Sequence, residues 1–215
     1  MTKIKICGLK RIEDIHLVNE CLPDYIGFVF AGSKRRIDRL TAMELKKELD
    51  PSIQAVGVFV NEPIEHIVAL CESNCIDIIQ LHGGEDNAYI HLLKKKVSTP
   101  IIKVIGVEPT MKSEELREHL SYKAYPTEFV MYDAMVKGQH GGSGIAFDHN
   151  LLNNQQNAFF LAGGLDANNV TKAIKICNPY CVDVSSGVET DGFKDRLKVR
   201  DFILAVRGIT KTERK

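Results

Sequence analysis

The sequence predicts an α/β protein, a single-domain (β/α)8 TIM barrel, on three observations. Its 215 residues suit one domain with a sizeable core. Short apolar segments alternate with helical patterns along the whole chain. Near the C-terminus, two successive apolar segments end in small residues, Gly163-Gly164 in one case and Ser185-Ser186-Gly187 in the other. Many barrels of this class bind a phosphate group at the turns after strands 7 and 8, so these turns are a candidate phosphate site.

Eight segments are predicted as strands because they are rich in Val, Ile and Phe and do not alternate strictly between polar and apolar residues. This composition is typical of parallel strands that are buried on both faces. In chain order the segments are residues 4–7, 25–30, 54–60, 76–81, 101–107, 128–133, 159–162 and 181–185.

Helical spacing of apolar residues appears between the predicted strands. In the second helix Met43, Leu45 and Leu49 mark the apolar positions and Thr41 is the predicted N-cap, while Pro63 opens the third helix in its first turn. The same alternation would fit a doubly wound open sheet, which periodicity alone does not exclude. The helical segments are those near residues 12–18 and 41–49, and residues 64–71, 86–93, 111–120, 148–152, 168–176 and 195–206.

Composition narrows the classes of function. Lys and Arg together number 28, as do Asp and Glu, so the net charge is zero and nothing indicates a nucleic-acid partner. No apolar run approaches the roughly 18 residues of a membrane-spanning helix, and the N-terminus lacks a signal-peptide core. The six cysteines are therefore expected as reduced thiols of a cytoplasmic protein, with no metal site. One domain over residues 1–215 is predicted, with 211–215 as a frayed, charged tail.

Polar side chains gather where the predicted strands end, which is where barrel enzymes carry their chemistry. Cys7 ends the first strand, Arg35 follows the second, Gln80 and His82 end the fourth, and Asp133 ends the sixth. Each has a structural explanation when taken singly: a core thiol, a solvated arginine, an interior amide, a capping histidine or a turn aspartate. Their shared position along the predicted barrel favours one active site.

Six motifs together resemble the phosphoribosylanthranilate isomerase family of tryptophan biosynthesis. They span essentially the whole chain in the family's order, and the first and the last three are highly specific. The motifs are Lys5-Ile6-Cys7-Gly8, Gly27-Phe28-Val29-Phe30, Gly57-Val58-Phe59-Val60-Asn61, Gln80-Leu81-His82-Gly83, Gly141-Gly142-Ser143-Gly144 and Asp183-Val184-Ser185-Ser186-Gly187-Val188-Glu189.

The resemblance implies an aldose–ketose isomerase that uses no cofactor and no metal. N-(5-phosphoribosyl)anthranilate would become 1-(2-carboxyphenylamino)-1-deoxyribulose 5-phosphate by an Amadori rearrangement. The resemblance assigns the general acid to Asp133, which would protonate the furanose oxygen, and the general base to Cys7, which would take the C2′ proton as a thiolate. Because a free thiol with a pKa of about 8.5 is mostly protonated at neutral pH, the base needs a nearby cation, for which Lys5 on the same strand face is a candidate.

The resemblance also implies the substrate contacts. Arg35 would bind the anthranilate carboxylate through its planar guanidinium, with Arg36 as second candidate because this loop is one residue shorter than the common family form. Residues 137–140 would form a mobile lid. The remaining substrate-binding residues are Gln80, His82, Gly142, Gly163, Gly164, Ser185, Ser186 and Gly187.

Two other interpretations fit the sequence less well. A ribulose-phosphate epimerase or an indole-glycerol-phosphate synthase would need a carboxylate pair with metal ligands, or a catalytic lysine with glutamates, at the strand ends. A catalytically inactive barrel that only binds a phosphometabolite would need neither Cys7 nor Asp133. The sequence is compatible with a monomer or a homodimer, with association with other tryptophan-pathway enzymes, and with activity on the related histidine-pathway aminoaldose.

Overall fold

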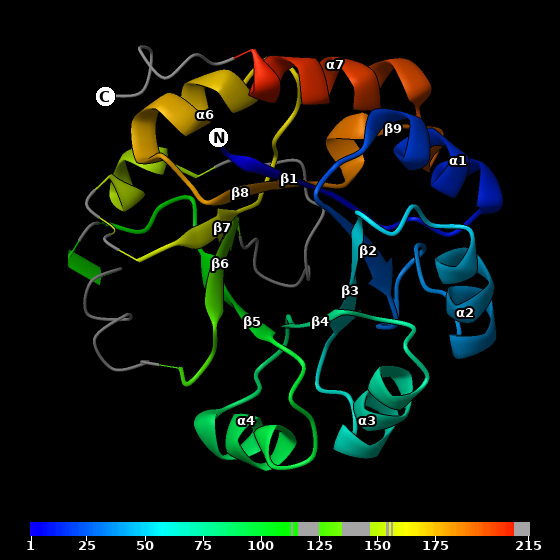
Figure 1. Cartoon of the computed structure of the whole chain (residues 1–215). Helices are drawn as coiled ribbons and strands as arrows, with labels where there is room; N and C mark the ends of the chain where they lie inside the picture. The colour runs from blue at the N-terminus through cyan, green and yellow to red at the C-terminus, as the bar shows by residue number, and fades with distance from the viewer. Residues whose placement is uncertain (113, 116–124, 135–146, 154, 156, 209–215) are drawn as a thin grey trace. The chain divides into compact units, whose positions relative to one another are not determined.

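In the computed structural model, which describes residues 1–112, 114–115, 125–134, 147–153, 155 and 157–208, eight strands form a closed barrel in the order β1 to β8 (Figure 1). The α/β barrel fold is thereby confirmed, and the open sheet is excluded. The strands are β1 (Lys3–Cys7), β2 (Tyr25–Val29), β3 (Gln54–Phe59), β4 (Ile78–Leu81), β5 (Ile101–Val107), β6 (Phe129–Ala134), β7 (Phe159–Leu161) and β8 (Cys181–Val184).

Contacts between residues divide the chain into two compact units. The first, called the N-terminal unit below, comprises Lys5–Val104 and Tyr125–Phe129. The second, the C-terminal unit, comprises Met1–Ile4, Ile105–Ala124 and Val130–Lys215. Within the described residues, no helix is long and apolar enough to cross a bilayer.

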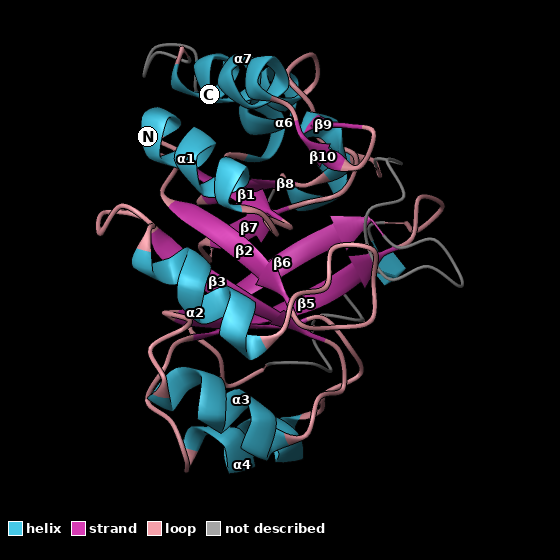
Figure 2. Ribbon diagram, turned by 90° about the vertical axis from the view of Figure 1, so that its right-hand side faces the viewer, coloured by secondary structure: helices cyan, strands magenta, loops and turns pink. Residues whose placement is uncertain are grey.

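In the N-terminal unit the helices lie outside the strands and cover them (Figure 1). Figure 2 shows α2 over β2 and β3, and Ala42 and Leu45 are the buried residues of this helix. The strands pair in register and in parallel, for example Cys7 with Gly27 and Val58 with Gln80. The helices are α1 (Ile12–Cys21), α2 (Arg39–Lys47), α3 (Ile64–Glu72) and α4 (Asn87–Lys94).

The start of α2 differs from the prediction. Asp38, and not Thr41, is the N-cap residue, because its carboxylate accepts the backbone N–H of Thr41 at 2.8 Å. Both residues are common at helix starts, and the carboxylate three residues earlier takes the cap position. Pro63 stands one residue before α3, at the N-cap itself.

The C-terminal unit contains helices α6 (Val170–Cys177) and α7 (Arg196–Arg207), which pack on each other. The predicted helix at 148–152 is a 3-10 turn, η1 (His149–Leu152), capped by Asp148. The sequence did not predict the 3-10 turn η2 (Ser186–Val188) or the hairpin of β9 (Glu189–Thr190) and β10 (Phe193–Lys194), seen paired in Figure 2. Most of the predicted helix at 111–120 lies outside the described residues.

Candidate active site

Cys7 is the last residue of β1 and is buried, with 8% of its surface exposed. It packs against Val29 and Val58 near the ends of β2 and β3. Gly27 stands opposite it in the β1–β2 register, and a Cβ atom there would lie 2.5 Å from the Cys7 sulfur. The glycine therefore leaves the space that the thiol occupies at the end of the strand.

A second polar side chain lies on β1, two residues before the thiol. Lys5 is fully buried, with an exposed fraction of 0%. Because side chains on a strand alternate between its faces, Lys5 and Cys7 point to the same side. The structure thus encloses a lysine along the strand face that ends in the thiol, as the sequence predicted.

Gln80 and His82, at the end of β4, contact each other. The Gln80 Nε2 lies 3.2 Å from His82 Nδ1, within hydrogen-bond distance. The Gln80 Oε1 is buried and has no hydrogen-bond partner among the described residues. Because an unpaired buried acceptor is costly, this oxygen is suited to accept a hydrogen bond from a ligand.

The loop that carries His82 is held by an ion pair that the sequence analysis missed. Lys103 Nζ lies 2.8 Å from the Glu85 carboxylate, and the two side chains are 2% and 1% exposed. The same ammonium donates to the Gly83 carbonyl at 2.7 Å. The carboxylate also accepts the backbone N–H groups of Asn61, at 2.8 Å, and Gly83, at 2.9 Å. The ion pair and its hydrogen bonds therefore connect the loop after β3, at Asn61, to the loop after β4, at Gly83, next to His82.

One signal in the sequence could have revealed this pair. Lys103 interrupts the otherwise apolar strand β5, and a charged residue in a strand buried on both faces requires a partner. The Lys103 ammonium also lies 5.7 Å from the centre of the Tyr125 ring. Burial, followed by the negative charge of Glu85, raises the pKa of that tyrosine above its ordinary value.

The two arginines of the loop after β2 differ in their exposure. Arg36 forms a backbone bridge with Val29, and its side chain is exposed. Arg35 is half-buried, and its N–H donates to Ser33 Oγ at 3.1 Å. The more enclosed side chain is thus the one that the sequence favoured.

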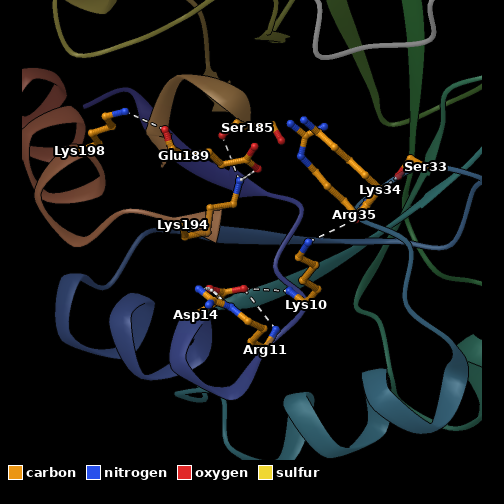
Figure 3. Close-up of polar contacts among 10 residues, drawn as sticks. All are labelled: Lys10, Arg11, Asp14, Ser33, Lys34, Arg35, Ser185, Glu189, Lys194 and Lys198. Atoms are coloured by element: carbon orange, nitrogen blue, oxygen red, sulfur yellow. Dashed lines mark hydrogen bonds and ion pairs between the residues drawn. The ribbon is translucent and has the colours of Figure 1, made fainter. Parts of the chain in front are cut away.

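A second loop fixes the position of this arginine loop. Lys10, after β1, donates from Nζ to the Lys34 carbonyl at 3.3 Å, as Figure 3 shows. Asp14 holds the Lys10 loop in turn, since its buried carboxylate accepts the N–H groups of Lys10 and Arg11 and pairs with the Arg11 guanidinium at 2.8 Å. The loops after β1 and β2 therefore support each other.

In the C-terminal unit, Asp133 is the fifth residue of β6 and is 7% exposed. Gly163, which follows β7, packs tightly beside it. A Cβ atom at Gly163 would lie 2.5 Å from the backbone nitrogen of Ala134, the residue after Asp133. Gly163 also has φ +95°, a conformation that residues with a side chain rarely adopt. The glycine therefore sets the position of the strand end that carries Asp133.

The two predicted phosphate turns lie against each other within the C-terminal unit. A Cβ atom at Gly187 would overlap the Leu165 carbonyl of the turn after β7. The first turn is further held by Asn169, whose Nδ2 donates to the Gly164 carbonyl at 2.8 Å. Within the described residues, the backbone N–H groups of Gly163, Gly164, Ser186 and Gly187 have no acceptor. Neighbouring backbone N–H groups without an acceptor can donate hydrogen bonds to a bound anion.

A second buried ion pair supports the turn after β8. Lys194 Nζ lies 2.8 Å from the Glu189 carboxylate, with side-chain exposures of 1% and 6%. It also donates to the Ser185 carbonyl at 3.0 Å (Figure 3). Lys194 was not among the residues predicted for the site, although Asp191-Gly192 shortly before it is a typical two-residue hairpin turn.

Gly142, the remaining predicted contact, lies outside the described residues, together with the Gly141–Gly144 motif and the predicted lid at 137–140. The six cysteines, all in the described part, form no disulfide there.

Comparison with known proteins relates the whole chain to one family. The model of the family described as N-(5'phosphoribosyl)anthranilate (PRA) isomerase matches residues 4–205. An N-(5'-phosphoribosyl)anthranilate isomerase from Endomicrobium trichonymphae is 48% identical over 209 residues, covering 97% of this chain and 100% of the relative.

Two crystal structures resemble the fold closely. One is a phosphoribosyl anthranilate isomerase in complex with reduced 1-(o-carboxyphenylamino)-1-deoxyribulose 5-phosphate, with a TM-score of 0.81 and 32% identity over 97% of this chain and 100% of the other. The other is that of monomers generated from the dimeric enzyme of Thermotoga maritima, with a TM-score of 0.80, 32% identity and the same coverage.

Proposed function

This chain belongs to the N-(5'-phosphoribosyl)anthranilate isomerase family, and we propose that it performs the isomerase step of tryptophan biosynthesis through Cys7 and Asp133. The single observation that carries the proposal is the family match over residues 4–205, which includes both residues. The substrate is N-(5-phosphoribosyl)anthranilate, and the product is 1-(2-carboxyphenylamino)-1-deoxyribulose 5-phosphate.

In the proposed chemistry the protein's part is proton transfer, and the bond changes take place within the substrate. Asp133 protonates the furanose ring oxygen, the C1′–O bond breaks, and the nitrogen lone pair forms an iminium ion at C1′. The Cys7 thiolate then takes the proton from C2′, which gives an enolamine that tautomerises to the ketose. C1′ is reduced while C2′ is oxidised, so the electrons stay within the substrate and the balance requires no redox cofactor.

The surroundings of Cys7 support its role as the base. The thiol stands at the C-terminal end of a barrel strand, where enzymes of this fold carry catalytic groups. Lys5 is a buried lysine on the same strand face, and a neighbouring cation favours the thiolate over the thiol. The small neighbour Gly27 leaves space around the sulfur.

The anthranilate end and the phosphate end of the substrate are proposed to be bound by different groups of the protein. Arg35 is proposed for the anthranilate carboxylate, supported by its partial burial and by the loop contacts that hold it. The backbone N–H groups in the turns after β7 and β8 that have no acceptor among the described residues are proposed to bind the phosphate. Gln80 and His82 are proposed to contact the sugar–anthranilate body, and the unpaired Gln80 Oε1 supports this assignment.

The test is turnover of freshly generated phosphoribosylanthranilate in the presence of EDTA, followed by the loss of substrate fluorescence. The variants C7A and D133N should each lower kcat by about 10²–10⁴-fold, the usual contribution of a general acid or base. C177A, which removes another buried thiol from α6, should keep kcat near that of the wild type. Near wild-type turnover in C7A or D133N would remove that residue from the mechanism.

A folded wild-type protein that binds the product analogue without turnover would instead support the inactive, binding-only barrel. R35A should raise KM much more than it changes kcat, and the same result in R36A alone would move the carboxylate contact to Arg36. EDTA sensitivity would contradict a metal-free reaction.

The remaining proposals concern the protein's setting. We propose that residues 1–215 act as one catalytic domain, because relatives matching 97% of this chain are covered over their full length. We also propose a reducing, cytoplasmic location, which six cysteines without a disulfide in the described residues support. Both a monomer and a homodimer are compatible with the family, as is association with other tryptophan-pathway enzymes, and sedimentation of the purified protein distinguishes the first two.

A further inference from the structure

The hairpin after η2 places a lysine beneath the proposed phosphate turn. Asp191 and Gly192 both have positive φ, +52° and +78°, as a tight hairpin turn of the I′ type requires. This turn pairs Lys194 directly with Glu189. Lys194 is thereby drawn into the protein, where its side chain is 1% exposed.

The buried ammonium holds one particular carbonyl. Lys194 Nζ donates to the Ser185 oxygen at 3.0 Å and to the Glu189 carboxylate at 2.8 Å (Figure 3). Ser185 lies after the end of β8 and is the N-cap residue of η2. The Val188 N–H, in the first turn of η2, also donates to this oxygen, at the longer distance of 3.4 Å. The ammonium is therefore the stronger contact at this carbonyl.

The geometry of the peptide group carries this contact to the next residue. In a planar trans peptide, the C=O and N–H groups point in opposite directions. The Ser185 carbonyl and the Ser186 N–H belong to the same peptide. When Lys194 holds the carbonyl on its own side, the Ser186 N–H must point to the other side, and there it has no acceptor among the described residues.

We propose that Lys194 is a positioning residue for phosphate recognition, which orients the Ser185–Ser186 peptide so that the Ser186 N–H faces the phosphate of the substrate. The inference rests on the proposed function, which places the phosphate at this turn. Lys194 acts through the backbone and does not itself contact the substrate. Glu189 balances its charge, so the lysine remains buried without an unpaired cation.

The chain offers a matched set of variants. E189Q removes the carboxylate but keeps an amide oxygen that can accept from Lys194. K194M/E189Q differs from it only at Lys194 and leaves no buried carboxylate without a partner. K198M is the control. Lys198 is exposed, and its ammonium donates to the Glu189 carbonyl of the same hairpin at 2.7 Å, whereas that of Lys194 donates to the Ser185 carbonyl.

The first measurement is a titration of each ¹⁵N-labelled protein with inorganic phosphate, followed at the Ser186 and Gly187 amide signals. The second is KM and kcat with the complete substrate. K194M/E189Q should bind phosphate about tenfold or more weakly than E189Q, the usual effect of losing a hydrogen bond that involves a charged group. KM should rise in parallel, kcat should change by less than about threefold, and K198M should match the wild type.

The outcomes separate the inference from the function on which it rests. Equal phosphate affinity in E189Q and K194M/E189Q would overturn the role of Lys194 alone. No response of the wild-type Ser186 and Gly187 signals to phosphate would overturn the phosphate site and the inference with it. A purely stabilising role would lower the urea midpoints and leave phosphate affinity unchanged, which also overturns the proposal. If the double variant does not fold, K194Q/E189Q against E189Q provides the same comparison, again with no buried carboxylate left without a partner.

Discussion

The buried pair of Lys103 and Glu85 allows a sharp prediction about stability. Glu85→Gln removes the negative charge from a carboxylate whose side chain is 1% exposed, while the 2% exposed Lys103 ammonium remains. The carboxylate accepts from three groups: Lys103 Nζ and the N–H groups of Asn61 and Gly83. An amide accepts only through its oxygen, so its NH₂ group must face at least one of these donors.

The magnitude follows from this geometry. Removing one partner of a buried ion pair costs about 3–5 kcal/mol, because the other charge stays buried without compensation. In urea unfolding followed by circular dichroism, E85Q should therefore lower the midpoint by about 1–2 M, given the usual slope for a chain of this size. The exposed pair of Glu65 and Lys96, 3.8 Å apart, gives the control, and E65Q should change stability by less than about 0.5 kcal/mol.

The double variant K103M/E85Q tests the physical reason. It removes both charges but keeps the same amide at position 85, so it should be more stable than E85Q. A loss below about 1 kcal/mol in E85Q would refute the reasoning, since the charge of Lys103 would then have found other compensation. A double variant as unstable as E85Q would show that loss of packing, and not an unpaired charge, causes the effect.

Three further predictions follow from single positions. G163A should lower both stability and kcat, because the new Cβ atom would lie 2.5 Å from the Ala134 nitrogen and the residue would also have to adopt a positive φ. G192A is the control: a Cβ there has no atom within 4 Å, so only the backbone cost of about 1–2 kcal/mol should appear. Equal losses of stability in the two variants would argue against the clash. Burial lowers the pKa of His149 below its ordinary 6.5, so the unfolded chain binds the proton more readily than the folded protein. The stability contributed by this histidine should therefore be full above about pH 6.5 and be lost as the pH falls through the folded-state pKa. Urea midpoints of H149Q should fall less with decreasing pH than those of the wild type, and identical profiles would show that His149 does not cause the fall. Burial raises the pKa of Cys177 to about 12, so iodoacetamide at about pH 8 should leave it unmodified in the folded protein but label it in urea, as mass spectrometry of the peptides would show.

Short-range patterns in the sequence were enough to predict most of the elements. The apolar run at 101–107 coincides with β5, six other strands differ from their predicted bounds by one or two residues at one end, and β6 is shifted by one residue at both ends. A strand buried on both faces has to be apolar along its length, so its sequence alone marks it. The polar residues at the strand ends, such as Cys7 and Gln80, were identified for the same reason, because they interrupt or end such runs.

The tertiary structure decided which residues hold these positions in place. Glu85 is separated from Lys103 by 18 positions in the chain, and no local pattern links them. Lys194 reaches Ser185 only because a hairpin turn folds it back. Hydrogen bonds and ion pairs of this kind depend on distances of a few ångströms between separate segments, which the order of residues does not specify. The sequence by itself therefore determined the barrel and the residues proposed for the chemistry, and the folded chain determined what orients them.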